Sequence, residues 1–351
     1  MENKKIISFS KPVQRIEWLD ILRGILIILM VFGHNIQFGS GDVVYYEQLY
    51  FENVVFRFIY SFHMPCLMII SGYLLNYSIE RKRFWRSKAK SLLIPTLLWS
   101  TVPTVLNLVR VIVKTGIGMD EVITVLTTLI CYYWFLWSIL FCTVVIWLNH
   151  RFFNDNVMLM AVLGIVFMML PEFLNTRLWF FSYPYFAVGY VWGGKKKIYI
   201  NKFEYREGII AVFLPIVFLA LFQFYNKESF IYTTGILVRS VRQLQIVLYR
   251  WCIGFVGSAI MVLAVYVIWG RASVRNHCVS RMLGYIGRNS ILIYLVDSLI
   301  NSYFLIRVCH KYGINYIVIS VETVIILAIC YCIEWWMRNF PNIRKVLLGS
   351  R

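Results

Sequence analysis

The sequence has little charge, and acidic residues are scarcer still. Only 15% of its 351 residues are charged, and 17 Asp and Glu stand against 35 Lys and Arg. Hydrophobic residues make up 60% of the chain, whereas soluble domains are roughly 45–50% apolar. This balance excludes an ordinary soluble globular protein, and it leaves the bulk of the chain no room for a separate soluble domain. It predicts an integral membrane protein.

Other signals are missing as well. The first apolar run carries His34 and lacks a small-residue cleavage site, so a cleavable signal peptide is not expected. The eight cysteines lie mostly within apolar runs, which favours packing roles over disulfides or a metal site. No internal repeat is evident, and this weighs against a transporter built from two related halves.

Apolar runs bounded by charged clusters predict an all-α, polytopic transmembrane bundle of about ten spans. The segment 121–148 is also compatible with a single long span. We expect a cytoplasmic N-terminal segment at 1–20, a transmembrane domain at 21–336 and a cytoplasmic C-terminal tail at 337–351. The ten runs are 21–38, 54–79, 91–113, 134–149, 156–171, 178–194, 208–225, 250–270, 287–306 and 314–336.

The distribution of basic residues orients these spans. With an inside N-terminus, the inside loops hold 25 of the 35 Lys and Arg, as the positive-inside rule requires. The bias predicts that both termini are cytoplasmic. It also explains the net charge of +18 as a topology signal, so no nucleic-acid partner is expected.

Two ionisable residues share one face of the first predicted span. Arg23 and His34 are eleven positions apart, which is three helical turns plus about 20° and roughly 16 Å along the axis. Ionisable groups at such depth are costly in a bilayer, and they usually face a cavity or the bundle interior. The pair therefore marks a candidate functional site.

The second span carries His63, followed by Pro65 and by Ser71-Gly72. Proline removes a backbone donor and loosens the turn before it. Small residues such as Ser71-Gly72 let a neighbouring helix approach closely. His63 is either a buried histidine that fixes helix packing or a residue that supports the site.

A strongly basic segment follows at residues 81–90. It contains Arg83, Arg86, Lys88 and Lys90 among its six basic residues. Such a cluster can set topology and contact anionic lipids. It can also receive the phosphates of a cytoplasmic donor, because clustered Arg and Lys bind phosphate.

Several motifs occur in a fixed order along the chain. They are Arg23-x10-His34 within WLDILRG (18–24), FHMP (62–65) with SGYL (71–74), the basic run closing on LLIP (92–95), WFL (134–136), YPYF (183–186) with Gly189-Tyr190, and GYIGRNSILIYL (284–295). By these motifs the chain resembles the acyltransferase-3 family of polytopic membrane O-acyltransferases, close to its fucose-4-O-acetylase-like branch, nearly from end to end.

The resemblance implies transfer of an acyl group, most often acetyl, from cytoplasmic acyl-CoA to a hydroxyl of a glycan or lipid-linked sugar. It implies a multi-pass protein of the plasma (inner) membrane, in contact with membrane lipid, that takes acyl-CoA as a co-substrate and needs no metal or bound cofactor. One departure stands out, because Asp297 occupies a position where the family usually has histidine.

The resemblance also suggests roles for single residues. His34, with Arg23, is expected to be catalytic, either as a general base or as a transiently acylated nucleophile. Asp20, Asp297 or Glu322 are candidates to orient a histidine or to bind the sugar, and Asp297 and Glu322 are alternatively ion-pair partners of Arg57 or Arg110. The outer aromatics Trp134, Trp179 and Tyr183 can stack on a sugar, although most such residues anchor a helix at the interface.

A transporter or flippase is the alternative function, because broken helices and intramembrane charge also line transport pathways. Consumption of acyl-CoA separates the two functions, since only a transferase uses the donor stoichiometrically.

We predict that a cysteine placed in the basic segment by Trp85→Cys, in a background without the native cysteines, is shielded in intact cells. A membrane-impermeant thiol reagent should label it only in inverted vesicles, because the basic loops are expected to be cytoplasmic. Labelling at this position from outside alone would overturn the topology.

Overall fold

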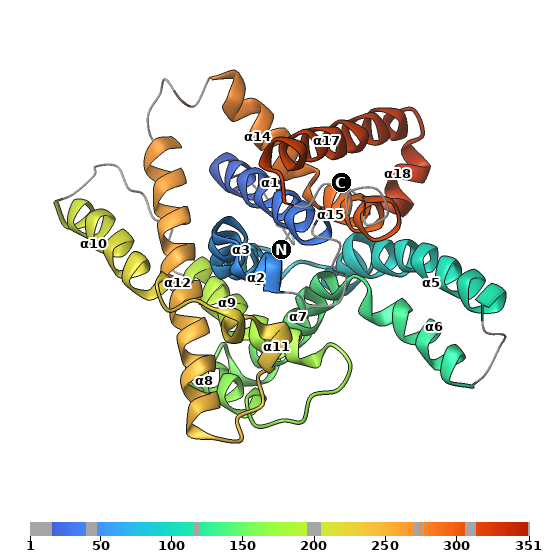
Figure 1. Cartoon of the computed structure of the whole chain (residues 1–351). Coiled ribbons are helices and arrows are strands. Elements are labelled where there is room, and N and C mark those ends of the chain that lie inside the picture. The colour runs from blue at the N-terminus through green and yellow to red at the C-terminus, as the bar shows by residue number, and fades with distance from the viewer. Residues whose placement is uncertain are drawn as a thin grey trace, which may run out of the picture.

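The computed structural model describes residues 16–39, 48–114, 119–194, 205–269, 274, 277–305 and 314–349. Across these residues it consists of helices and loops and contains no β-strand, so the predicted all-α class is confirmed. Helix α1 (Glu17–Gly39) lies at the centre beside α3 (Val54–Asn76), and the remaining helices are arranged around them (Figure 1).

The helices follow the apolar runs of the sequence. Three short elements are a 3-10 turn and two π-helical turns: η2 (Lys227–Ser229), η1 (Ala89–Leu93) and η3 (Asn301–Leu305). The other α-helices are α2 (Gln48–Glu52), α4 (Phe84–Lys88), α5 (Ile94–Lys114), α6 (Met119–Cys131), α7 (Trp134–Phe153), α8 (Val157–Phe167), α9 (Thr176–Gly194), α10 (Tyr205–Phe222), α11 (Ile231–Thr234), α12 (Val241–Trp269), α14 (Cys278–Arg288), α15 (Ser290–Ile300), α17 (Tyr316–Arg338) and α18 (Pro341–Leu347).

Polar residues just before the apolar runs start several of these helices. The Asn53 side chain accepts from the backbone N–H of Phe56 at 2.9 Å and caps α3. Asn315 caps α17 in the same way. Such caps satisfy backbone donors that the first helical turn leaves unpaired.

Six helices of the described part are long and apolar enough to cross a membrane. Three shorter apolar helices, at Val157–Phe167, Ile210–Phe222 and Ser290–Phe304, coincide with three more of the predicted spans, and α9 coincides with the remaining one. The count of ten and the side of each terminus remain predictions. The single long span considered for 121–148 is wrong, because α6 ends at Cys131 and α7 begins at Trp134.

The outward faces of the bundle are apolar. Val109 on α5, Phe213 on α10 and Val324 on α17 are each more than half exposed, at 53%, 61% and 65%. Exposed apolar surface of this extent is rare on soluble proteins and is the surface that lipid covers. Buried polar side chains lie inside the bundle instead, among them Asp20, Asn35 and Gln37 on α1.

Glycines bring α1 and α14 into close contact. A Cβ added at Gly287 would overlap the backbone carbonyl oxygen of Asp20, and one added at Gly24 would overlap that of Leu283. Small residues drive such crossings in membranes, where helix association depends on close packing more than on the hydrophobic effect.

The second close crossing joins α3 and α9. A Cβ at Gly72 would overlap the carbonyl oxygen of Phe186, and one at Gly189 would overlap that of Ile69. The expectation that Ser71-Gly72 admits a neighbouring helix is therefore confirmed, and α9 is that neighbour. The two glycine crossings fix α1 and α3, the helices that carry the two membrane histidines.

We predict that Gly287→Ala destabilises the protein while Gly284→Ala, its matched control on the same helix, is tolerated. The nearest atom to a Cβ at Gly284 is the flexible Arg288 guanidinium at 3.4 Å, whereas Gly287 faces rigid backbone. Overpacking costs about 1–3 kcal/mol or more, so Gly287→Ala should lower the melting temperature in detergent. Equal melting temperatures for both variants would contradict the packing described for α1 and α14.

Candidate active site

The bundle interior contains a histidine held by a carboxylate. His34 Nδ1 and Asp297 Oδ2 are 2.6 Å apart, and the His34 side chain is 20% exposed while that of Asp297 is fully buried. Asn301 Nδ2 donates to the other carboxylate oxygen, Oδ1, at 2.7 Å. The three side chains form one chain of hydrogen bonds between α1 and the end of α15.

Local backbone geometry places Asp297 at this depth. Helix α14 stops at Arg288, and α15 restarts at Ser290 after Asn289. A π-helical turn, η3, follows at Asn301–Leu305, and such turns occur frequently at functional sites. The residue that sequence reasoning missed is Asn301, although its i+4 spacing from Asp297 places both on one helix face.

The hydrogen bond selects one form of the histidine. A carboxylate can only accept, so Nδ1 carries the proton and donates it to Asp297. In neutral His34 the lone pair is then on Nε2, so Nε2 is the ring nitrogen that can act as a base or as a nucleophile. A histidine oriented in this way by a buried acid is suited to take a proton or an acyl group.

Helix α17 supports the same region of α1. Asn35 is the residue after His34, and its Nδ2 donates to Thr323 Oγ1 at 3.0 Å. Glu322, a predicted supporting residue, is buried on α17 next to Thr323. The acid that holds His34 is Asp297, which corrects the suggested pairing of Asp297 with Arg57 or Arg110.

The two arginines have other contacts. Arg57 donates to the backbone carbonyl of Tyr225 and lies over the Phe222 ring. Arg110 lies over the Tyr303 ring, 5.9 Å from its centroid.

His63 is only 1% exposed. Its Nδ1 donates to the carbonyl oxygen of Ile59 at 2.8 Å, and its ring packs edge-on against Tyr60, with centroids 4.8 Å apart. His63 therefore packs within α3 beside Tyr60, whose ring would also meet a Cβ at Gly33 of α1. Its supporting role at the His34 site stays a prediction.

Arg23 and Asp20 lie at the other end of α1. Arg23 pairs with Asp20 at 3.8 Å, where the Asp20 backbone meets Gly287 of α14. Neither is in the His34–Asp297–Asn301 hydrogen-bond chain, so the expected role of Asp20 in orienting a histidine does not apply to His34. Arg23 remains on the same helix, about 16 Å away along the axis.

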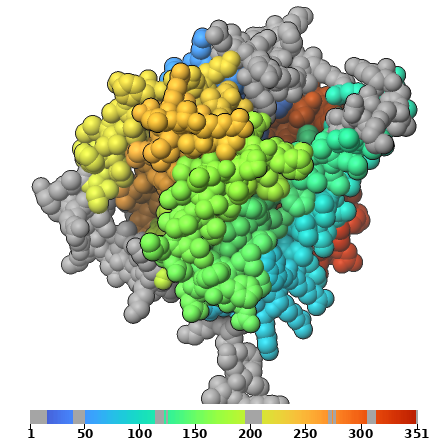
Figure 2. All heavy atoms as spheres, turned by 90° about the horizontal axis from the view of Figure 1, so that it is seen from below, coloured from blue at the N-terminus to red at the C-terminus, as the bar shows by residue number. Residues whose placement is uncertain are grey.

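The predicted donor residues lie on α4 and η1, apart from Arg83, which directly precedes α4. Arg83, Arg86 and Lys90 are exposed, and Lys88 is half-buried with its ammonium over the Phe84 ring at 5.5 Å. Figure 2 shows this cyan part of the chain beside the red C-terminal residues, and Trp99 Nε1 of α5 donates to the carbonyl of Leu347 at 3.0 Å. The C-terminal helix α18 therefore packs beside the basic segment.

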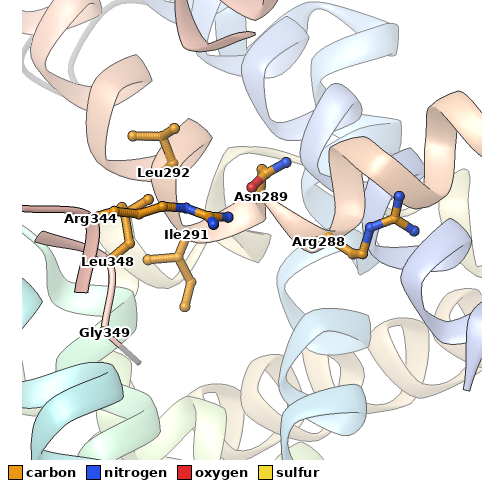
Figure 3. Close-up of a pocket in the computed structure, with 7 residues that line it drawn as sticks. All are labelled: Arg288, Asn289, Ile291, Leu292, Arg344, Leu348 and Gly349. Carbon is orange, nitrogen blue, oxygen red and sulfur yellow. The ribbon is translucent and has the colours of Figure 1, made fainter. Parts of the chain in front are cut away.

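A pocket opens where these elements meet α15. Its lining includes Arg288, Asn289, Leu292, Arg344 and Gly349 (Figure 3). We call the end of the bundle that carries this pocket, Arg23 and residues 81–90 the basic end.

A second pocket has mainly aromatic walls. Trp134, one of the three aromatics proposed from the sequence, lines it, whereas Tyr183 is fully buried and Trp179 packs on Phe141. Tyr60 links this pocket to α1, because its hydroxyl donates to Gln37 Oε1 at 3.3 Å and its ring would meet a Cβ at Gly33, next to His34. Its aromatic lining includes Tyr60, Trp134, Phe181, Tyr185, Tyr225, Phe230 and Tyr232.

A partly accessible histidine held by a buried acid, inside a bundle of apolar helices, is typical of a functional site within a membrane protein, and its chemistry suits proton or group transfer. The sequence profile of the acyltransferase-3 family, described as an acyltransferase domain, matches residues 16–338. The chain belongs to that family and is an acyltransferase. This result confirms the motifs found in the sequence and favours the transferase over the transporter or flippase.

Two curated relatives match most of the chain. Nodulation protein NolL of Mesorhizobium japonicum is 25% identical over 344 residues, which cover 94% of this chain and 89% of the relative. Nodulation protein NolL of Sinorhizobium fredii is 26% identical over 288 residues, covering 79% and 76%. No solved structure matches the chain.

We predict that His34→Gln and Asp297→Asn each reduce acyl transfer by about 10²–10⁴-fold. Glutamine can still hydrogen-bond to Asp297 but cannot act as a base. Asparagine offers its N–H to Nδ1 and favours the tautomer in which Nε2 is protonated. Both variants keep an amide in the hydrogen-bond chain, so each should still fold as a monodisperse protein, and its melting temperature is measured beside its activity. A folded His34→Gln variant with undiminished transfer would remove His34 from the active site.

Proposed function

We propose that the protein is a plasma (inner) membrane O-acetyltransferase. It takes acetyl-CoA on the cytoplasmic side and acetylates a hydroxyl of a cell-surface glycan or lipid-linked sugar. The observation that carries the proposal is the His34–Asp297 hydrogen bond of 2.6 Å within the bundle. A sugar hydroxyl is a weak nucleophile, and an oriented histidine is the group that activates one near neutral pH.

His34 acts as general base in the proposed reaction. Nε2 takes the proton of the acceptor hydroxyl while the oxygen attacks the thioester carbonyl. The carbon–sulfur bond then breaks, and the proton passes to the departing thiolate, so the products are the O-acetyl ester and CoA. Asp297 stabilises the imidazolium that forms between these steps, and Asn301 keeps the carboxylate in place.

The donor site is assigned to the basic end. Arg83, Arg86, Lys88 and Lys90 gather positive charge on one short segment, and phosphate groups bind such clusters through charge-assisted hydrogen bonds. Arg23 adds a further guanidinium on α1, the helix that leads from this end to His34.

The acceptor is assigned to the aromatic pocket. Trp134 and Tyr232 pack edge to face in its wall, with ring centroids 6.3 Å apart. Aromatic side chains with polar tips suit a ligand that has both apolar faces and hydroxyl groups. Tyr60 connects this pocket to the turn of α1 that holds His34.

The decisive experiment follows radiolabelled acetyl-CoA in membranes that contain the protein, with His34→Gln membranes as the matched control. We expect label on a glycan or lipid-linked sugar, lost in the control. Label retained on the protein in the absence of acceptor would instead indicate an acyl-histidine, to which the same Nε2 atom is suited. Donor that stays unconsumed in the presence of a complete cell-envelope acceptor fraction would overturn the proposal.

The donor site is tested by two double variants, Arg83→Ala with Arg86→Ala and Lys88→Ala with Lys90→Ala. Each removes two positive charges, and at least one pair should raise the KM for acetyl-CoA while leaving protein abundance unchanged. Both double variants are needed, because Arg83 with Arg86 and Lys88 with Lys90 are alternative contacts for the donor. Unchanged donor dependence in both would reduce the segment to a topology signal.

A further inference from the structure

The pocket at the basic end has one wall that the family match does not include. The match stops at residue 338, whereas Arg344, Leu348 and Gly349 come from α18 and the residues after it. The facing wall is the break between α14 and α15, with Arg288 and Asn289. In Figure 3 the Arg344 side chain extends from α18 toward Asn289.

Several contacts hold this C-terminal wall in place. Arg344 pairs with Glu334 Oε1 at 3.2 Å, and Glu334 is itself almost fully buried. The Trp99 indole bonds to the carbonyl of Leu347. Gly349, at φ +78°, lies so close to the basic segment that a Cβ there would stand 2.6 Å from Ser91 Cα and 2.8 Å from the Lys90 carbonyl oxygen.

Arg344 retains donors for a ligand. Glu334 accepts one hydrogen bond from it, and a guanidinium has five N–H groups in a planar fork. The second Glu334 oxygen is occupied by Arg338 at 2.8 Å and by the Tyr285 hydroxyl at 2.6 Å. In Figure 3 the Arg288 side chain extends away from Arg344, and its guanidinium lies over the Tyr285 ring, 5.9 Å from the ring centroid. Arg344 is therefore the charged group that points toward the pocket.

The pocket lies at the N-terminal end of the helix that carries Asp297. Ile291 and Leu292 of α15 line it, and Asp297 lies five residues beyond Leu292 on the same helix, about 8 Å along the axis. The pocket and the acid that holds His34 therefore belong to one helix.

We propose that Arg344 on the C-terminal helix α18 binds a phosphate group of the acyl-CoA donor. This inference rests on the proposed function and assigns the donor pocket a wall outside the matched acyltransferase domain. Lipid headgroups carry the same phosphate chemistry, so the test separates donor from lipid.

The experiment measures binding to the full-length protein in nanodiscs of neutral lipid. Titration calorimetry gives the Kd for CoA and for pantetheine, which lacks phosphate. Arg344→Gln should weaken CoA binding about tenfold to a hundredfold, the usual worth of a charged hydrogen bond, and should leave pantetheine binding unchanged. Arg338→Gln is the matched control, because Arg338 also pairs with Glu334 but is absent from the pocket lining, and it should bind CoA normally.

Arg344→Lys is the second variant, for the case in which the glutamine variant misfolds. Lysine keeps the positive charge but lacks the planar guanidinium, so this variant should bind CoA with an intermediate Kd. Equal CoA affinity in folded Arg344 and Arg338 variants would overturn the inference. The inference would also be overturned if Arg344→Gln bound CoA normally and lost only the stabilisation that added phosphatidylglycerol provides, because Arg344 would then bind lipid. If the unchanged protein fails to bind CoA at all, the proposed function fails rather than the assignment of Arg344.

Discussion

The hydrogen bond between His34 and Asp297 joins α1 to α15, and the two residues are 263 positions apart in the chain. Burying an acid beside a histidine costs free energy, and removing one partner of such a pair typically costs about 3–5 kcal/mol because the other is left alone. Contacts elsewhere in the bundle keep this pair in place. Helix α1 is surrounded by other helices, glycines bring α14 against it, and Asn301 satisfies the second carboxylate oxygen.

The same arrangement separates two chemically different ends. The end near Arg23 is rich in guanidinium and ammonium groups, and the aromatic pocket near Tyr60 is rich in rings and hydroxyls. His34 stands between them on α1. Asp297 gives His34 a carboxylate partner. An aspartate fixes one tautomer, whereas a second histidine can donate or accept.

Much of the fold could be predicted from the sequence, because apolar runs of membrane length have few alternatives to a helix. His34 and Asp297 were both recognised as candidates, since ionisable groups are rare at that depth. Their pairing was beyond reach, because nothing in a single sequence reports which of two distant helices are neighbours. Glu322 looked equivalent to Asp297 for the same reason.

Other residues of the site were missed for different causes. Asn301 is an ordinary polar residue until the acid four positions earlier is known to be buried. Arg344 looked like one more charge of a cytoplasmic tail, because topology alone accounts for basic residues near a membrane. Its place in a pocket depends on how α18 folds back against α5, and that depends on tertiary contacts such as the bond from Trp99 to Leu347.

The close packing of Gly349 ties the C-terminal wall of the pocket to the basic segment. The buried backbone of Gly349 lies against Lys90 and Ser91, at a φ of +78° that glycine adopts without steric cost. Any side chain at this position would have to displace backbone atoms of the basic segment. The wall and the segment are therefore held together at a residue that has no side chain.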